Sequence, residues 1–367
     1  MTFIDWFAGI GGFRKGMEDA GHKCVGFCEW DKYAVMSYTA MHLATPEQLD
    51  YLKKLSMRKR QEEITKEEYK NGEWYADDIR RVDARSMPQA DCWGFGAPCQ
   101  DFSNAYTKRQ GLDGSRSSLV REVFRLLKEI REDDRPEWII YENVKGMLSS
   151  NRGFDFLAIL LEMDECGYDI EWELLNSKDF GIPQNRERVY TIGHLRRYGE
   201  QKVFPLAEFC EADSTDERYR VLCTNTIQGI NKLSRGIYVI GGETDFLIAK
   251  VNGYHALSKS ETLCQPEQDN VQIMDESISS KDFLMFKKLI GRQRKNTVDH
   301  LLSGERKIRK LTPRECFRLQ GWTDGYIDRA MMVNSDSQLY KQAGNGVTVN
   351  VVEAIAKRIA VTKERIG

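Results

Sequence analysis

Cys99 follows an apolar run in a segment, residues 94–103, that is rich in glycine and contains Pro98. Most cysteines in proteins are small, buried hydrophobic residues. A cysteine on a loop at the end of a strand is instead exposed and can react as a thiolate. The sequence therefore predicts that Cys99 is a nucleophile.

Glu142 and two arginines add an acid and two cations to this nucleophile. Glu142 comes after four apolar or aromatic residues, so partial desolvation favours its neutral, proton-donating form. Arg186 and Arg188 are two positions apart at the start of a strand-like run, which predicts that both side chains lie on one face. Such an arginine fork suits a carbonyl oxygen or a phosphate. We predict that these residues form the catalytic set with Cys99.

The start of the chain carries a nucleotide-binding pattern. Residues 7–12 form a glycine-rich turn, whose backbone can approach a ligand closely. Glu29 lies 20 residues beyond Gly9, where a carboxylate accepts hydrogen bonds from both hydroxyls of a ribose, and residues 78–79 are a candidate adenine contact. The residue five beyond Gly9 is Arg14 and not the glycine of dinucleotide-binding motifs. This difference disfavours a cofactor that contains a pyrophosphate.

Alternating strands and helices must position these residues. Apolar runs predict strands at residues 3–7, 24–28, 91–95, 138–141, 170–175 and 188–193, and helical patterns occupy residues 13–21, 118–131, 154–166 and 345–357. This alternation predicts an α/β fold with a mostly parallel sheet and helices on both faces. Ligands bind at the carboxyl edge of such a sheet, which is where Glu29, Cys99 and Glu142 are expected.

Two segments interrupt the alternation. Residues 46–75 are dense in mixed charge and predict an exposed helical insertion, to which we assign no chemistry. Residues 196 to about 310 contain short β-rich pieces with glycines, such as residues 235–242 and 246–251. A chain of 367 residues is long enough for two domains, so this segment predicts a second, smaller one.

Composition limits the class of protein. The chain is 41% hydrophobic and 30% charged, with no apolar run of about 18 residues and no secretory leader, and is expected to be soluble and intracellular. Nine cysteines without a Cys-x-x-Cys pair, and only five histidines, argue against a metal site and fit a reducing compartment. The net charge of −2 argues weakly against a nonspecific polyanion binder, although basic residues can still gather on one face.

In the order of its motifs the sequence resembles the DNA (cytosine-5) methyltransferases of bacterial and phage restriction-modification systems. The matching motifs are residues 5–12, Glu29, residues 78–79, Pro98-Cys99-Gln100, Glu142-Asn143-Val144, residues 184–188, residues 309–316 and residues 342–347. They cover nearly the whole chain and leave out only the insertion and the middle of the second domain. Gly346 departs from the family, which often has serine at that position.

The resemblance implies a Rossmann-like methyltransferase fold that binds S-adenosylmethionine. The cofactor domain is then discontinuous, residues 1–195 plus about 335–367, with a target-recognition domain at about 196–334. The implied cofactor contacts are Phe7, Gly9, Gly11, Glu29, Trp30, Asp78, Ile79, Pro98, Leu119, Asn345 and Val347. The implied DNA contacts are Gln100, Ser103, Gln184 and a Thr-(Leu or Ile) pair, either Thr226-Ile227, which we favour, or Thr262-Leu263.

The implied reaction is methyl transfer from S-adenosylmethionine to C5 of a cytosine in a specific sequence of double-stranded DNA. Cys99 adds to C6 of the ring, Glu142 assists at N3 and Arg188 holds the O2 carbonyl. C6 is out of reach inside a duplex, so the base must rotate out of the helix.

Other functions stay open at this point. An RNA cytosine-5 methyltransferase uses the same chemistry, and a nonenzymatic DNA-binding regulatory module can keep the fold. The long segment at residues 196–310 favours DNA, and the intact catalytic set favours an enzyme. A nicotinamide or flavin oxidoreductase is disfavoured by the missing third glycine. We expect a cytoplasmic monomer that acts separately from any cognate restriction endonuclease.

Overall fold

The computed structural model describes residues 1–96, 119–199, 201–206 and 307–364, together with four short strands between residues 222 and 258. The chain divides into two compact units. The first unit comprises Met1–Leu175, Glu187–Glu211 and Gln320–Gly367, and the second comprises Asn176–Arg186 and Ala212–Leu319. The boundaries near residues 211 and 319 differ from the predicted domain ends near 195 and 335.

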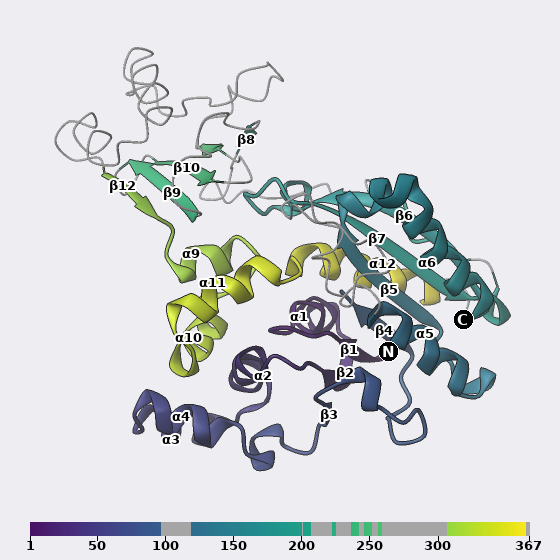
Figure 1. Ribbon diagram of the computed structural model, residues 1–367, viewed down its shortest axis with the longest axis horizontal. Helices are drawn as coiled ribbons and strands as arrows, with labels where there is room; N and C mark the ends of the chain where they lie inside the picture. The colour runs from purple at the N-terminus through teal and green to yellow at the C-terminus, as the bar shows by residue number, and fades with distance from the viewer. Residues whose placement is uncertain are drawn as a thin grey trace. The chain divides into compact units, whose positions relative to one another are not determined.

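A seven-stranded sheet forms the centre of the first unit (Figure 1). Its strands are β1 Thr2–Trp6, β2 Lys23–Cys28, β3 Trp74–Ala76, β4 Cys92–Phe95, β5 Trp138–Val144, β6 Tyr168–Asn176 and β7 Glu187–Leu195. Their order across the sheet is β3-β2-β1-β4-β5-β7-β6. Neighbouring strands from β3 to β5 are parallel, whereas β7 runs antiparallel to β5. The predicted, mostly parallel α/β sheet is therefore confirmed.

The helices of the first unit lie between these strands and after them in the sequence. They are α1 Gly12–Asp19, α2 Lys32–Tyr38, the π-helix η1 Thr39–Leu43, α3 Pro46–Lys53, α4 Met57–Ile64, α5 Val120–Glu129, α6 Phe154–Glu165, α10 Asp324–Val333, α11 Asp336–Asn345 and α12 Val349–Glu364. The short 3-10 turns are η2 Glu67–Lys70, η3 Ile79–Arg81, η6 Glu132–Asp134, η7 Lys145–Gly153 and η9 Arg196–Tyr198. The helix predicted at residues 345–357 instead begins at Val349, because the preceding residues leave α11 in an extended conformation.

Helices cover both faces of the sheet. Alternate residues of a strand point to opposite sides, so each face contributes its own set of side chains. One face contributes Ile4, Trp6, Trp93, Phe95, Ile139 and Tyr141 to a buried cluster with α5 and α6. On the other face α1 packs against α12. A Cβ atom added to Gly94 would lie 2.9 Å from the Phe13 ring, so α1 approaches the sheet closely there.

Gly16 allows the close packing of α1 on α12, since an added Cβ would lie 2.6 Å from Cβ of Val352. We expect Gly16→Ala to lower the free energy of unfolding by about 1–3 kcal/mol through overpacking. Gly325 in α10 is the matched control, because no described atom lies within 4 Å of a Cβ placed there. Gly325→Ala should be neutral or stabilising by up to about 1 kcal/mol. Urea unfolding of both variants checks this, and equal midpoints would contradict the packing described.

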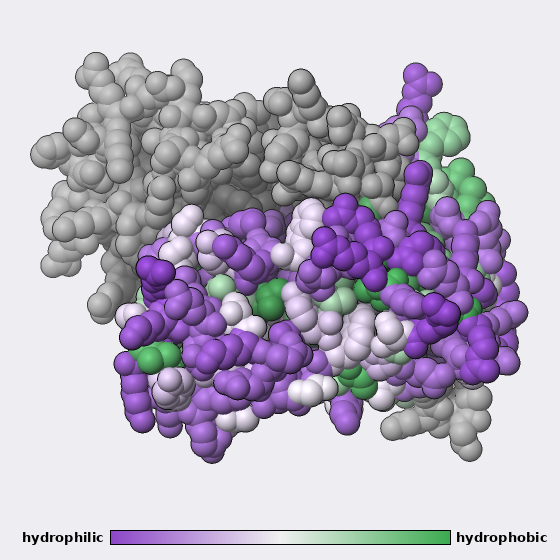
Figure 2. Space-filling model, turned by 60° about the horizontal axis from the view of Figure 1, so that its bottom comes forward, coloured by the Kyte–Doolittle hydropathy of each residue, from purple (hydrophilic) through white to green (hydrophobic). Residues whose placement is uncertain are grey.

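The charged segment at residues 46–75 is helical, as predicted, but it is more integrated than an exposed insertion. Leu49, Leu52 and Ile64 are buried in a cluster that includes Val333 of α10. The segment ends in β3, which pairs with β2 and extends the sheet. Figure 2 turns the bottom of Figure 1 toward the viewer, and the face of this region that it shows is mainly hydrophilic. Its charges therefore face solvent while its apolar side fixes α10, which explains why residues 320–334 belong to the first unit.

The second unit contains a five-stranded sheet with the order β12-β9-β10-β11-β8. Its strands are β8 Leu222–Thr224, β9 Gly236–Gly241, β10 Phe246–Val251, β11 Ala256–Ser258 and β12 Lys307–Lys310, and neighbouring strands in this order are antiparallel. The unit also contains η8 Ser177–Phe180 and α9 Pro313–Arg318, which begins with a capping box between Thr312 and Glu315. Within the part of the chain that the structure describes, no helix is both long and apolar enough to cross a bilayer.

Candidate active site

The turn between β1 and α1, residues 7–11, is called here the glycine loop. Gly9 and Gly11 have φ angles of 57° and 84°, and Phe7 also adopts a left-handed conformation with φ of 56°. For a non-glycine residue this conformation costs about 1–3 kcal/mol, so the surrounding structure must impose it. No described atom lies within 4 Å of a Cβ placed on Gly9, so the loop is open at that point. Its backbone is therefore accessible to a ligand.

Glu29 holds the glycine loop in place. Its Oε2 accepts a hydrogen bond of 2.8 Å from the Gly9 N–H, and its Oε1 accepts one of 2.7 Å from the Asp31 N–H. Burial raises the pKa of Glu29, although these backbone donors oppose the shift. A carboxylate has about four acceptor positions, and the Trp30 N–H also contributes, so Glu29 can still accept at least one further hydrogen bond. This capacity suits a ribose hydroxyl.

The remaining cofactor residues predicted beside β2 differ in exposure. Trp30 is 57% exposed, with the Arg80 guanidinium 5.9 Å from its ring centroid. Asp78 pairs with Arg80 at 2.6 Å, and this hydrogen bonding lowers the pKa of Asp78. Ile79 is buried in the core. Trp30 thus offers an open aromatic surface, whereas the Asp78 carboxylate is already engaged.

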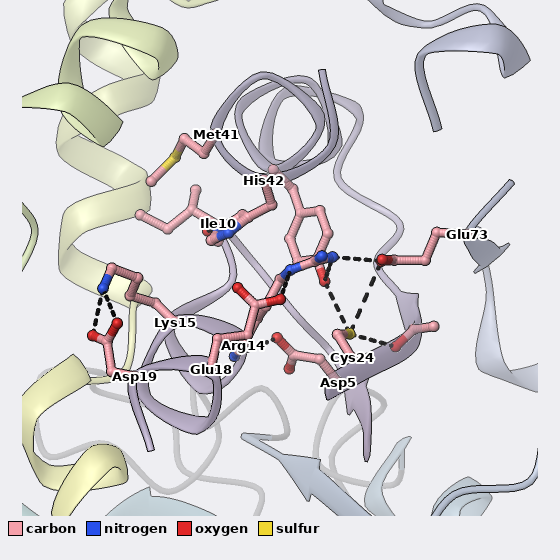
Figure 3. A network of polar contacts seen from close by, with 12 residues as sticks. Asp5, Ile10, Arg14, Lys15, Glu18, Asp19, Cys24, Met41, His42 and Glu73 are labelled. Carbon is pink, nitrogen blue, oxygen red and sulfur yellow. Dashed lines mark hydrogen bonds and ion pairs between the residues drawn. The ribbon is translucent and has the colours of Figure 1, made fainter. Parts of the chain in front are cut away.

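Arg14, which replaces the third glycine of dinucleotide-binding motifs, is the centre of a buried polar network (Figure 3). Its backbone N–H donates to Asp5 at 3.2 Å, and its guanidinium pairs with Glu18 at 2.9 Å and Glu73 at 2.5 Å. Burial raises the pKa of the adjacent Cys24 thiol to about 12, which leaves that thiol unreactive. Arg14 therefore has a structural role and fixes α1 behind the glycine loop.

Glu142 and Arg188 form an ion pair at the carboxyl end of β5. Arg188 Nε lies 3.0 Å from Glu142 Oε1, and the antiparallel register places Arg188 opposite Val144. Glu142 is only 9% exposed, and its carboxylate lies against the Arg188 guanidinium. The pair thus combines a buried acid with a fixed cationic donor.

The end of β4 lies beside this pair. A Cβ placed on Gly96 would be 3.2 Å from Glu142 Oε2 and 3.6 Å from the Val347 side chain. The Val347 carbonyl oxygen would in turn be 2.8 Å from a Cβ on Gly12, at the start of α1. The ends of β4 and β5, the start of α1 and Val347 therefore meet at one place. Cys99 is three residues beyond Gly96 in the sequence and lies outside the described residues.

The other predicted residues fall in three groups. Leu119 is buried at the start of α5, and Asn345 is exposed at the end of α11. Gln184 and Arg186 belong to the second unit, where the Arg186 N–H donates to Asn176 Oδ1 at 3.0 Å. Outside the described residues are Pro98, Cys99, Gln100, Ser103, Thr226, Ile227, Thr262 and Leu263.

Two residues in contact with the site have roles that the sequence does not predict. Asn143 donates to the Tyr141 hydroxyl at 2.5 Å and accepts from the Val144 N–H at 2.7 Å, so it stiffens the end of β5. His42 Nε2 lies 2.9 Å from the Ile10 carbonyl oxygen of the glycine loop. A single histidine in a helical segment has no distinctive spacing, so only the fold identifies it.

Comparison with known proteins agrees with this arrangement. The model of the family described as C-5 cytosine-specific DNA methylase matches residues 1–54 and 66–361. The type II methyltransferase M2.ScrFI of Lactococcus lactis subsp. cremoris is 29% identical over 400 residues, which cover 98% of this chain and 99% of that protein. The type II methyltransferase M.HhaI of Haemophilus parahaemolyticus is 31% identical over 376 residues, covering 98% and 94%.

The fold has a solved counterpart as well. The crystal structure of the S. pombe Dnmt2 methyltransferase aligns with a TM-score of 0.59 at 17% identity, covering 100% of this chain and 99% of that one. This likeness shows a shared methyltransferase fold. The family match spans nearly the whole sequence and includes every element of the site. The chain therefore belongs to the C-5 cytosine-specific DNA methylase family and is a DNA cytosine-5 methyltransferase.

Proposed function

We propose that this methyltransferase takes its methyl group from S-adenosylmethionine, held by the glycine loop and Glu29. The observation that supports this is the Glu29 carboxylate, which is fixed by two backbone N–H groups and keeps acceptor capacity for a ribose hydroxyl. The exposed Trp30 ring suits stacking on an adenine. When bound, the cofactor supplies an electrophilic methyl group on a sulfonium. Leu119, Asn345 and Val347 are the further proposed contacts.

The proposed role of Glu29 predicts a specific binding defect. Glu29→Ala removes charge-assisted hydrogen bonds to the ribose and frees the Gly9 N–H, so we expect the dissociation constant for S-adenosylmethionine to rise by about 10- to 100-fold. DNA affinity should stay near that of the parent. Isothermal titration measures the first quantity, with Glu62→Ala as a control that removes an exposed carboxylate paired with Arg58 on α4. Superimposable titrations of parent and Glu29→Ala would contradict the assignment.

We propose that Cys99 activates the cytosine by covalent addition. C5 of cytosine is a weak nucleophile, and addition of the Cys99 thiolate to C6 makes it an enamine carbon. Negative charge then develops on the ring, where Glu142 protonates or hydrogen-bonds N3 and Arg188 donates to O2. After C5 gains the methyl group, solvent water takes the C5 proton, and the electrons of that C–H bond restore the ring double bond and expel Cys99 as a thiolate. The Glu142–Arg188 pair at 3.0 Å is the described part of this machinery.

The proposed substrate is a cytosine in a specific sequence of double-stranded DNA. Rotation of the base out of the duplex costs a few kcal/mol in stacking and pairing, which contacts from a second domain must offset. We assign this role to the second unit, with Gln184 and either Thr226-Ile227 or Thr262-Leu263 as DNA contacts, and propose Gln100 and Ser103 as further DNA contacts. Arg186 remains a proposed member of the catalytic set with Arg188. We also propose that the enzyme acts as a monomer in the cytoplasm, independently of any cognate endonuclease.

Transfer of a tritiated methyl group tests this proposal directly. The purified protein is incubated with labelled S-adenosylmethionine and either mixed-sequence duplex DNA, the same duplex with every cytosine already methylated at C5, or RNA. We expect label only in the unmethylated duplex and recovery of 5-methylcytosine after its digestion. Label in RNA but not in DNA, or label on another base, would overturn the proposal.

A further inference from the structure

We propose that His42 is a positioning residue for the glycine loop and thereby sets the affinity for the methyl donor. This inference rests on the proposed binding of S-adenosylmethionine at that loop. His42 lies in none of the motifs that carry the family resemblance. It comes from η1 and reaches the Ile10 carbonyl of the loop, whereas α1 continues directly from the loop in sequence (Figure 3).

The local helix geometry directs His42 at the loop. Residues Thr39–Leu43 form a π-helix, closed by a 2.8 Å hydrogen bond from the Ala44 N–H to the Thr39 carbonyl. A π-turn inserts one residue into a helix and rotates the side chains that follow, and such turns are frequent at functional sites. Here it places His42 Nε2 2.9 Å from the Ile10 carbonyl oxygen.

The direction of this hydrogen bond fixes which nitrogen carries the hydrogen in the neutral ring. A carbonyl oxygen only accepts, so Nε2 carries a hydrogen, and in the neutral ring Nδ1 is then the nitrogen with the lone pair. Nδ1 is buried and has no hydrogen-bond partner among the residues that the structure describes. Protonation would therefore create a buried Nδ1–H donor that has no acceptor among these residues.

The neighbours of the ring favour the same neutral form. Burial, and then the positive charges of Arg14, Lys15 and Arg329, hold the pKa of His42 well below its usual value. The rings of Tyr38 and Tyr326, with centroids 4.9 and 5.4 Å from that of His42, restrict its orientation. His42 is thus an oriented, neutral hydrogen-bond donor at neutral pH.

The glycine loop is consequently held at two adjacent residues. Glu29 accepts from the Gly9 N–H at 2.8 Å, and His42 donates to the Ile10 carbonyl. A Cβ atom on Gly11 would overlap His42 Nε2, so a glycine at this position is required both by its φ of 84° and by the approach of the histidine. Fixing the peptide between Gly9 and Gly11 presents the loop backbone in one conformation, which reduces the entropy lost on binding a ligand.

Two substitutions separate the hydrogen bond from the packing of the ring. His42→Phe keeps an aromatic ring against Tyr38 and Tyr326 but cannot donate, whereas His42→Gln carries an amide nitrogen that reaches as far as Nε2. His22→Phe is the matched control, because His22 Nε2 also contacts a backbone carbonyl, that of Ala356 at 3.2 Å, away from the loop. Isothermal titration with S-adenosylmethionine, mobility shift with duplex DNA and thermal unfolding are measured for all four proteins.

We expect His42→Phe to raise the dissociation constant for S-adenosylmethionine by about 3- to 10-fold, the loss of one hydrogen bond, with kcat at saturating cofactor and DNA affinity unchanged. His42→Gln should restore affinity to within about 2-fold of the parent. His22→Phe should lower the Tm without changing cofactor affinity. Parental affinity in His42→Phe, equal losses in His42→Phe and His22→Phe, or no recovery in His42→Gln would each overturn the inference. A parent that binds no S-adenosylmethionine would instead refute the proposed cofactor site on which the inference rests.

Discussion

Replacement of Cys99 by alanine is expected to abolish methyl transfer while the protein still binds DNA. Without the thiolate, C5 of cytosine is never activated, and the remaining residues only bind and orient the base. We expect a fall in rate of at least about 10⁴-fold, the scale seen when a covalent nucleophile is removed. Tritium incorporation into duplex DNA measures the rate, and mobility shift at fixed salt measures binding, since DNA affinity depends strongly on ionic strength.

Cys166→Ala provides the control for this experiment. Cys166 is fully buried in the cluster beneath α5 and α6, and burial raises the pKa of its thiol. Its replacement removes a thiol without removing a nucleophile, so activity should remain within a few-fold of the parent, about the effect of a small packing change. Methyl transfer that survives in Cys99→Ala would show that another group attacks the base.

Replacement of Glu142 by glutamine is expected to reduce the single-turnover rate by about 10²- to 10⁴-fold, the usual contribution of a general acid. Glutamine keeps the shape and one hydrogen-bonding oxygen but neither donates a carboxyl proton nor pairs with the Arg188 guanidinium, 3.0 Å away. The affinity for S-adenosylmethionine should be unchanged, because Glu29 and the glycine loop are not altered. Rapid-quench measurement with enzyme in excess over DNA separates this chemical step from product release.

Glu187→Gln is the matched control on the neighbouring strand. Glu187 precedes Arg188 in the sequence and pairs with Lys145 at 2.9 Å on the exposed surface. Exposed pairs contribute about 0–1 kcal/mol, so this variant should retain the parental rate. A rate for Glu142→Gln within about 5-fold of the parent would be too small for a general acid and would remove Glu142 from the proposed mechanism.

The central strands could be predicted from the sequence because they are buried on both faces. Such strands are continuous apolar runs, and β1, β2 and β4 follow the predicted ranges within two residues. β3 has three residues, Trp74–Ala76, next to a highly charged segment, so no apolar run marks it. β5 extends to Val144 because Glu142 and Asn143, although polar, are held in the strand by pairing with β7.

The site was predictable in its parts but not in its contacts. Glu142 and Arg188 each belong to a recognisable motif, whereas their ion pair depends on the antiparallel register of β7, which alternation of residues does not specify. His42 was missed because its role depends on a π-turn and on a carbonyl 32 positions earlier in the chain.

The insertion shows a similar limit. Its charge predicts solvent exposure, but Gln61 donates to the Val333 carbonyl at 2.8 Å and Arg60 to the Met332 carbonyl at 3.4 Å. These bonds cap the end of α10 with residues that lie between the two segments matched by the family model. Capping by a distant helix leaves no signal in local sequence, so the support that α4 gives to α10 could be found only in the fold.

Bisulfite sequencing of genomic DNA tests the central claim most directly. The protein and its Cys99→Ala variant are each expressed in a bacterium that lacks cytosine methylation. Cytosines protected from conversion at one short recurring sequence, and only in cells with the parent protein, are the predicted result, because they report the modified base and the sequence specificity together. Complete conversion of the genome in cells that contain folded parent protein would contradict the account.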